Sequence, residues 1–450
     1  MVTDSIFTEY RNQTELILAE MKQATLIHVE GKVTSIQGTL IVSQFPAPRI
    51  GDLCEVWPDG AAVILAEVVA FEGEKVWLSS LNPLDGVEAG AKLVPLYMPH
   101  RVRVGDFALG SILDGFGRDM RGKSGVFCLS DVTQSGSANV LVDDIDPTDK
   151  PRISYPMPTG VKAIDALLTL GEGQRVGLFA GAGCGKTTLI AEIARGMPCD
   201  VIVFGLIGER GRELNEFIEY ELDEALQART VLICATSDRS STERARAAFT
   251  ATAIAEAFRD QGKKVLLLID SLTRFARAQR EIGLAAGEPP GRGGFPPSVA
   301  ALMPRLLERA GPSSKGSITA IYTVLIEQDS MADPVADEAR SLLDGHIILS
   351  RKLADKGHYP AIDILPSLSR TMSNVTTKDH QKTARRFREL LASYRDVELL
   401  IKLGEYQAGS DPLTDAAVDK HVAMMAFLQQ SLHESQPFKH CIEQFKKVIC

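Results

Sequence analysis

The sequence predicts an α/β protein with a doubly wound parallel sheet, preceded by a small β-barrel and followed by a helical domain. Three observations lead to this prediction. Short apolar runs separated by turn residues fill residues 25–95, which is typical of a small barrel. Near-continuous apolar strands then alternate with helical stretches, as in parallel sheets buried on both faces. The strands stop near residue 372, so the expected divisions are 1–24, 25–95, 96–372 and 373–450.

Composition and charge exclude several classes of protein. Of 450 residues, 45% are hydrophobic and 24% are charged, the ordinary balance of a soluble globular chain. The 49 lysines and arginines are outnumbered by 58 aspartates and glutamates, which gives a net charge of −9. We therefore expect no global attraction to nucleic acid or anionic lipid, although a local basic patch stays open. Seven scattered cysteines without a C-x-x-C pair favour reduced thiols and a cytosolic location.

The first 24 residues carry apolar side chains at weak helical spacing among charged and amide residues. This pattern fits a frayed terminal helix or a helix that docks a partner, and the sequence leaves both open. Residues 1–12 lack the basic-then-apolar order of a signal peptide. The longest apolar runs, such as Val265–Ile269, are far shorter than the roughly 20 residues that span a bilayer, so any membrane association would be peripheral.

The apolar runs of each region define its expected elements. Turn residues separate those of the barrel, which predicts short antiparallel strands in Leu26–Val29, Leu40–Val42, Leu53–Val56, Ala62–Val69 and Val76–Leu78. The runs of the sheet domain are Val176–Phe179, Val201–Ile207, Val231–Cys234, Val265–Ile269, Ile318–Ile326 and Ile347–Leu349. Beyond residue 372, Lys378–Leu403 and Pro412–Lys447 are helical in pattern.

A glycine-rich loop with the order of a phosphate-binding site follows the first strand of the sheet domain. In the segment Phe179–Thr188, an apolar strand leads through this loop into a helical stretch. Glycines let backbone N–H groups turn towards phosphate oxygens, and the helix N-terminus adds a positive dipole. Lys186 would reach the β- and γ-phosphates, and the Thr187 hydroxyl would ligate Mg²⁺. The residues expected to hold the nucleotide are Gly181, Ala182, Gly183, Cys184, Gly185, Lys186, Thr187 and Thr188.

Two acidic residues are candidates for metal binding and hydrolysis. Asp270 ends a buried apolar strand, which fits the Walker B role of holding Mg²⁺ through a water molecule. Hydrolysis needs a second carboxylate to polarise water, and Glu209 follows the strand Val201–Ile207 at the edge where parallel strands bind ligands. The alternative for this region is a solvated charge cluster at a helix start, where glutamates such as Glu213 suit the helix dipole.

Four segments together resemble the secretion ATPases, which are the type III injectisome ATPase and its flagellar export counterpart. The segments are Gly171–Arg175, the phosphate loop, Ile207–Glu213 and Asp270–Ile282, and the resemblance runs from about residue 25 to residue 435. Both ATPases are similar to the catalytic β subunit of rotary ATP synthases. The resemblance implies a RecA-like domain that binds ATP and Mg²⁺, with hydrolysis coupled to chaperone release, unfolding and export of secreted proteins.

The resemblance also implies roles for individual residues. Glu209 would orient the attacking water, Arg210 would lie beside the nucleotide and Glu213 would form an outer-shell contact to the metal's water. Arg370, in a Ser-Arg motif after a strand, would act as an arginine finger in the neighbouring subunit's site, and the alternative for it is a local ion pair. Because one chain carries both Glu209 and Arg370, a homohexamer with sites between subunits is expected.

Partners and location are implied by the resemblance as well. Residues 1–24 would meet a stator-like regulator protein, and the C-terminal helices would meet secretion chaperone–effector complexes. The ring would also engage a central stalk protein and the export gate, and no nucleic acid is expected. Such a protein would be cytoplasmic and peripherally associated with the cytoplasmic face of the inner membrane. The segments Gly311–Ser317 and His346–Lys352 look closer to the injectisome branch than to the flagellar one.

Departures from the usual motifs fall at three places. Ala180 stands where the phosphate-loop pattern has glycine, and Gly291–Gly293 has a single arginine where the family has two adjacent ones. Gln328 and Ser330 replace a glycine and an aspartate after a glutamate. We expect these last changes to alter turnover or stalk coupling while nucleotide binding is kept.

Three alternative functions stay open. A rotary ATP synthase-type subunit would need partner chains. An RNA-driven hexameric motor of the transcription-terminator type would want paired aromatic and basic residues on the barrel, where residues 25–95 have only Phe45, Trp57, Phe71 and Trp77. A structural ring with bound nucleotide would hydrolyse ATP no faster than its own Lys186→Ala variant.

Overall fold

The computed structural model describes residues 29–38, 40–121, 136–142, 148, 150–326, 333–409 and 411–449. The chain divides into two compact units, one ending at Pro99 and the other beginning at His100. The expectations for residues 1–24, for all of the predicted strand Leu26–Val29 except Val29, and for Gln328 and Ser330 lie outside the described residues.

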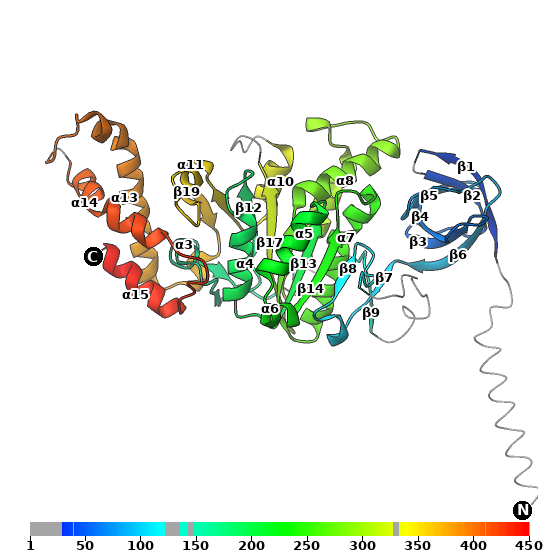
Figure 1. Cartoon of the computed structure of the whole chain (residues 1–450), viewed down its shortest axis with the longest axis horizontal. Coiled ribbons are helices and arrows are strands. Elements are labelled where there is room, and N and C mark those ends of the chain that lie inside the picture. Colours follow the sequence, from blue (N-terminus) through cyan, green and yellow to red (C-terminus); the bar gives the residue numbers. More distant parts are fainter. Residues whose placement is uncertain are drawn as a thin grey trace, which may run out of the picture. The chain divides into compact units, whose positions relative to one another are not determined.

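The first unit is a closed antiparallel barrel, as the sequence predicts (Figure 1). Its strands are β1 (Gly31–Gln37), β2 (Leu40–Gln44), β3 (Asp52–Trp57), β4 (Ile64–Glu72), β5 (Lys75–Ser80) and β6 (Lys92–Pro99). They close in the order β1-β2-β5-β4-β3-β6, and each neighbouring pair is antiparallel. The predicted runs omit β1, which contains no continuous apolar run, and β6, whose apolar run contains Pro95, a residue that disfavours a strand.

The second unit is built on a mostly parallel sheet, which confirms the predicted doubly wound fold. Its strands are β8 (Ile112–Asp114), β12 (Arg175–Ala180), β13 (Val201–Ile207), β14 (Thr230–Ala235), β15 (Lys264–Asp270), β16 (Gly311–Pro312), β17 (Ser317–Leu325), β18 (Gly345–Leu349) and β19 (Ile362–Ser369). The order is β19-β18-β12-β17-β15-β13-β14-β8, with β16 paired to β17. Strands β19 and β16 are antiparallel to their neighbours, which the purely parallel expectation misses. Two short ribbons join β7 (Arg101–Arg103) to β9 (Ser137–Asn139) and β10 (Pro156–Met157) to β11 (Leu170–Gly171).

Helices cover both faces of this sheet (Figure 1). The helices between residues 160 and 376 are α3 (Lys162–Leu167), α4 (Lys186–Gly196), α5 (Gly211–Glu216), α6 (Glu224–Ala228), α7 (Ser241–Asp260), α8 (Leu272–Ala285), α9 (Pro297–Leu307), α10 (Pro334–Leu342), α11 (Arg351–Asp355) and α12 (Met372–Val375). Strand β15 shows why its run is continuously apolar: Leu266 and Leu268 belong to the core on one face, and Leu267 and Ile269 to the core on the other. Successive side chains of such a strand point to opposite faces of the sheet and pack into two apolar layers. Few positions in the strand therefore accept a polar side chain.

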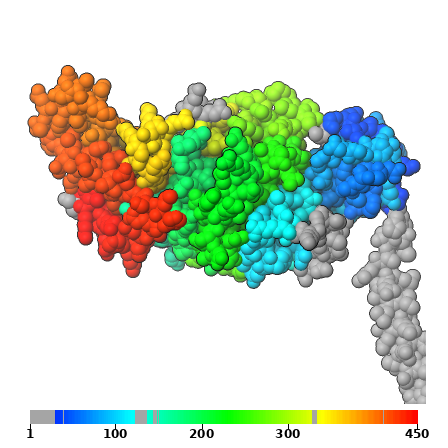
Figure 2. Space-filling view, in the orientation of Figure 1, coloured from blue at the N-terminus to red at the C-terminus, as the bar shows by residue number. Residues whose placement is uncertain are grey.

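The C-terminal region is helical, as predicted, and consists of α13 (Lys378–Leu403), α14 (Pro412–Leu428) and α15 (Phe438–Ile449). Phe387, Phe427 and Phe445, one from each helix, meet with ring centroids 5.4–6.5 Å apart and anchor the three helices to one another. These helices form one continuous region of the surface (Figure 2, orange to red). Among the described residues, no helix combines the length and the apolar character needed to cross a membrane.

Candidate active site

The phosphate loop joins the end of β12 to the start of α4. Gly183 and Gly185 have φ angles of 80° and 78°, in the left-handed region that favours glycine, and Gly185 is the residue before the helix. Ala180, in contrast, ends an extended strand and pairs with Leu325, so its backbone does not need the freedom of glycine. The loop therefore curves after the strand, where glycines stand, and the departure at Ala180 leaves that curve unaffected.

Three predicted charged groups meet beyond the carboxyl ends of the parallel strands. Lys186 forms an ion pair with Asp270, and its Nζ lies 3.8 Å from Oε1 of Glu209. The side chains of Lys186, Glu209 and Asp270 are only 13%, 14% and 3% exposed, which strengthens their mutual interactions. Thr323 donates a hydrogen bond of 2.7 Å to Oδ1 of Asp270 and fixes that carboxylate. This edge of a parallel sheet is where α/β folds place their ligands.

Glu209 lies in an environment that disfavours its charged form. Burial is the largest cause, and the Asp270 carboxylate adds to it, so that the pKa of Glu209 is raised above its ordinary value. Lys186 and Arg274 oppose this shift, and Nη2 of Arg274 lies 3.8 Å from Oε2 of Glu209. The sequence reasoning missed Arg274, although it lies four residues beyond Asp270, in the first turn of α8, where the Ser271 hydroxyl caps the helix by accepting from the Arg274 amide.

Arg210 and Glu213 lie at the rim of this group. Their side chains are 79% and 51% exposed and pair with each other at 3.6 Å. Glu213 also contributes a hydrogen bond that raises the pKa of Glu209. The arrangement brings Glu213 close to the buried carboxylate and leaves the guanidinium of Arg210 directed towards solvent.

Arg370 is not brought to this group within one chain. It follows β19, whose last residue, Ser369, pairs with Gly345 at the start of β18. Ile348, three residues further along β18, pairs with Phe179, so Ser369 lies ~10 Å before the level of Phe179 along the strands. The phosphate loop lies beyond Phe179, at the opposite edge of the sheet. Among the described residues, the exposed side chain of Arg370 forms no ion pair. This observation disfavours the alternative in which Arg370 serves only in a local ion pair.

An apolar cavity of about 460 Å³ adjoins the phosphate loop and was missed by the sequence reasoning. Its walls come from the loop and α4, from the Tyr359–Ala361 segment, and from the connection between α14 and α15. Aromatic and aliphatic side chains around a few polar groups suit a flat heterocycle. The lining residues are Val161, Gly183, Cys184, Gly185, Thr188, Leu189, Glu192, Leu349, Tyr359, Pro360, Ala361, Gln430, Ser431 and Leu432.

The oxygen donors of the site suit a hard divalent cation. Thr187 is an exposed hydroxyl at the first turn of α4, and the carboxylate of Asp270, fixed by Thr323, pairs with the adjacent Lys186. In the part of the chain that the structure describes, no cluster of three or more histidine, cysteine, aspartate or glutamate side chains is placed to hold a metal. This donor set fits Mg²⁺, which usually takes one or two protein oxygens and completes its shell with phosphates and water.

Comparison with known proteins assigns the family. Residues 160–369 match the nucleotide-binding domain of the ATP synthase alpha/beta family, and residues 376–447 match the EscN ATPase C-terminal domain of type III secretion. The chain is 60% identical to a type 3 secretion system ATPase of Pseudomonas syringae pv. tomato over 96% of both chains. It is 46% identical to a flagellum-specific ATP synthase of Bacillus subtilis over 90% of this chain and 91% of that protein.

Solved structures agree with this assignment. The assembled ATPase EscN from enteropathogenic E. coli superposes with a TM-score of 0.86 at 47% identity, covering 93% of this chain and all of that one. The same ATPase in complex with its central stalk EscO gives a TM-score of 0.85 at 46% identity, with the same coverage. The predicted preference for the injectisome branch over the flagellar branch is confirmed by these matches. The chain therefore belongs to the type 3 secretion system ATPases, which carry the nucleotide-binding domain of the ATP synthase alpha/beta family.

Proposed function

We propose that this ATPase hydrolyses Mg²⁺-bound ATP at sites shared by neighbouring copies in a homohexameric ring, and so drives chaperone release, unfolding and export of secreted proteins. One observation carries the proposal. Lys186, Glu209 and Asp270 meet at the phosphate loop, whereas Arg370 lies at the opposite edge of the same sheet. A complete site then needs the Arg370 of another subunit.

ATP binding is divided between the loop and the cavity. Backbone N–H groups of Gly181 to Thr188 cradle the phosphates, and Lys186 exchanges part of its interaction with Asp270 for the β- and γ-phosphate oxygens. The adenine ring enters the apolar cavity beside Tyr359. The Thr187 hydroxyl would hold Mg²⁺ directly, and Asp270 would hold it through water, with Glu213 in the outer shell. The bound ion would neutralise charge on the phosphate oxygens.

Glu209 orients the water that attacks the γ-phosphate. Its carboxylate accepts a hydrogen bond from that water, and a raised pKa makes it a stronger proton acceptor than an ordinary glutamate. Arg274 holds the Glu209 carboxylate from the side away from Lys186. Arg210, exposed at the rim, lies beside the nucleotide once the neighbouring subunit closes the site.

Arg370 acts in the neighbouring site as an arginine finger. Its guanidinium is exposed and would stabilise charge that develops on the transferred phosphate, an interaction worth about 10³–10⁵-fold in rate in other phosphoryl-transfer enzymes. The relative EscN has been solved as an assembled ATPase and with a central stalk, which supports the ring and a stalk partner here. A head-to-tail ring gives every interface one Glu209 and one Arg370.

The remaining partners follow from the exposed surface and the resemblance. Leu399, Leu403 and Val422 on α13 and α14 are 66%, 62% and 78% exposed, and they offer apolar contacts for chaperone–effector complexes. Residues 1–24 bind a stator-like regulator. The ring works at the cytoplasmic face of the inner membrane, against the export gate, and binds no nucleic acid.

A mixing experiment tests the shared site. Glu209→Gln and Arg370→Ala are each expected to lower the hydrolysis rate by at least ~10³-fold. Mixing them under conditions of subunit exchange restores activity, because about a quarter of head-to-tail interfaces then combine an intact Glu209 with an intact Arg370. Phosphate release measures the recovery.

A matched control separates recovery from dilution effects. Glu209→Gln mixed with Lys186→Ala places both lesions in the same half of the site, so every interface lacks either Glu209 or Lys186 and activity stays low. Failure of Glu209→Gln to recover with Arg370→Ala, when labelled subunits show exchange, would refute the role of Arg370 in a neighbouring site.

A further inference from the structure

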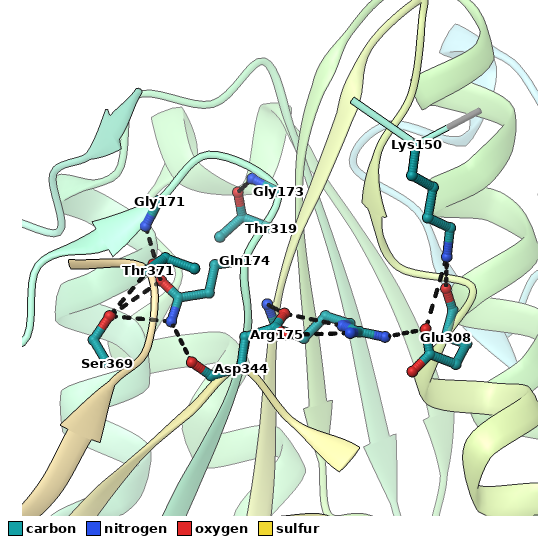
Figure 3. A network of polar contacts seen from close by, with 10 residues as sticks. All are labelled: Lys150, Gly171, Gly173, Gln174, Arg175, Glu308, Thr319, Asp344, Ser369 and Thr371. Atoms are coloured by element: carbon teal, nitrogen blue, oxygen red, sulfur yellow. Dashed lines mark hydrogen bonds and ion pairs between the residues drawn. The ribbon is translucent and has the colours of Figure 1, made fainter. Parts of the chain in front are cut away.

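A cluster of buried and half-buried polar groups lies at the amino end of the strand that carries the phosphate loop (Figure 3). We call it the finger-base cluster, and it consists of Gln174, Arg175, Asp344, Ser369 and Thr371. Gln174 directly precedes β12, Asp344 directly precedes β18, and Ser369 and Thr371 flank Arg370. Three segments far apart in the sequence therefore meet at one point.

The side chain of Gln174 holds these segments together. It is fully buried, and its Oε1 accepts hydrogen bonds from the Gly171 amide at 2.9 Å and from the Thr371 hydroxyl. Its Nε2 donates to the carbonyl of Asp344 at 3.1 Å and to Oγ of Ser369 at 3.2 Å. An amide whose oxygen and nitrogen both have buried partners is fixed in one orientation.

Asp344 connects this amide directly to Arg370. The carbonyl oxygen that accepts from Gln174 also accepts from the backbone N–H of Arg370, at 2.9 Å. The Asp344 carboxylate is held by Arg175 through two parallel bonds of 3.0 and 3.1 Å, and Arg175 forms a further ion pair with Glu308 at 2.5 Å. Bidentate pairs of this kind restrict both position and angle.

The space around the cluster is closed as well. A Cβ on Gly345 would lie 2.6 Å from the Leu368 carbonyl oxygen and 3.1 Å from Nε2 of Gln174. The guanidinium of Arg370, in contrast, is exposed and donates a long hydrogen bond of 3.4 Å to the Arg340 carbonyl. The backbone N–H of Arg370 is thus held by the Asp344 carbonyl that Gln174 also binds, and the charged end of Arg370 projects from that base.

We propose that Gln174 is a positioning residue for Arg370, so that it supports hydrolysis in the neighbouring subunit's site more than in its own. This inference rests on the proposed role of Arg370 as an arginine finger. The cluster fixes where the guanidinium starts from, and a displacement of about 1 Å at a catalytic group can cost on the order of 10²-fold in rate. Gln174 also directly precedes the strand that leads into its own phosphate loop, so the cluster joins two adjacent sites through one rigid element.

The structure also permits a purely local role, in which Gln174 braces β12 and the phosphate loop of its own chain. The two roles predict opposite results when subunits are mixed. A local defect lies in the half of the site that contains Glu209, whereas a positioning defect lies in the half that contains Arg370. The recovery of activity on mixing therefore distinguishes the two roles, even if each role would lower the rate of a Gln174 variant by the same factor.

The main variant is Gln174→Met, which keeps the length of the side chain and removes both polar groups. We expect its kcat to fall by about 10–100-fold while KM for ATP changes less than threefold, because Arg370 acts on the transition state. A second, milder variant is Thr371→Val, which removes the hydroxyl bound to Gln174. Its matched control is Thr252→Val, at a buried hydroxyl that bonds only within α7, and the control should keep the parent rate.

Mixing gives the decisive readout. Gln174→Met should recover activity with Glu209→Gln and should not recover with Arg370→Ala. The reverse pattern, recovery with Arg370→Ala alone, would overturn the proposal in favour of the local role. If Gln174→Met does not assemble, Thr371→Val decides through the same two mixtures, and a kcat equal to that of Thr252→Val would count against the proposal. Failure of the Glu209→Gln and Arg370→Ala pair itself would instead refute the arginine finger.

Discussion

The two ends of β12 are built in opposite ways. At the carboxyl end, Lys186 faces two carboxylates, Glu209 and Asp270, whose charges it can compensate only in part. At the amino end, Gln174 and Arg175 have matched partners for their polar groups. The carboxyl end therefore holds interactions that phosphate oxygens and a metal can replace, while the amino end has nothing to exchange. One strand thus serves binding at one end and rigidity at the other.

The largest effect should come from the charged end. Lys186→Ala removes the group that meets the β- and γ-phosphates, and we expect hydrolysis to fall by about 10³-fold, as when one transition-state donor is lost. Phosphate release at saturating ATP measures this fall. If Lys186→Ala kept more than a tenth of the parent rate, the carboxyl end of β12 would not be the site of hydrolysis. The contrast between the two ends of β12 would then be wrong.

The next effect is on stability and belongs to the amino end. Arg175→Met leaves the Asp344 carboxylate, 27% exposed, without its bidentate partner, and should lower the free energy of unfolding by about 2–3 kcal/mol. Urea denaturation with nucleotide absent gives the value. Lys402→Ala is the matched control: its ion pair with Glu398 is exposed, and about 0.5 kcal/mol or less should be lost. A loss as small as that control would show that the amino end is not a rigid anchor.

The smallest effect expected is a gain of stability at the charged end. Because the pKa of Glu209 is raised in the folded protein, folding favours its protonated form, and the charged form opposes folding at neutral pH. Glu209→Gln should therefore raise the thermal midpoint at pH 7, and the gain should vanish as the pH falls below the ordinary carboxyl range. Hydrolysis by the parent should decline as the pH falls through the raised pKa.

The same change from glutamate to glutamine at Glu398 should shift the thermal midpoint in the opposite direction. Hydrogen bonding and charge from Lys402 lower the pKa of Glu398, so its charged form favours folding. Glu398→Gln is expected to lower the midpoint slightly at pH 7. Equal shifts of the thermal midpoint for Glu209→Gln and Glu398→Gln would contradict the opposite pKa shifts of these two residues.

Much of the fold could be predicted because its signals are local. Strands β13 and β15 are apolar at nearly every position, since both faces of the sheet are covered, and such runs are visible without knowledge of the fold. Strand β1 gives no such signal, because polar residues separate its few apolar ones, whereas the apolar run of β6 contains Pro95, which disfavours a strand. Antiparallel pairing of β19 also left no local signal, since it depends on which partner a strand meets.

The charged part of the candidate site was also accessible from the sequence, since strand, loop and helix follow one another around Lys186. The cavity was not, because Gln430 and Leu432 lie far along the chain from Gly185 and have no distinctive spacing. Gln174 was read only as part of a family motif. Its four partners come from three separate segments, and nothing in the residues around it indicates that it contacts Ser369 and Thr371.

The order of the sheet has a consequence for biosynthesis. Strand β12, which leads into the phosphate loop, pairs with β17 and β18. Both of these strands are synthesised much later than β12. About 140 residues separate its last residue from the first of β17, which at 5–20 residues per second is roughly 7–28 s of translation. During that time an apolar strand has left the ribosome without its sheet. We therefore expect chaperones that shield unpaired strands to bind the nascent chain of this ATPase, before it ever handles a client of its own.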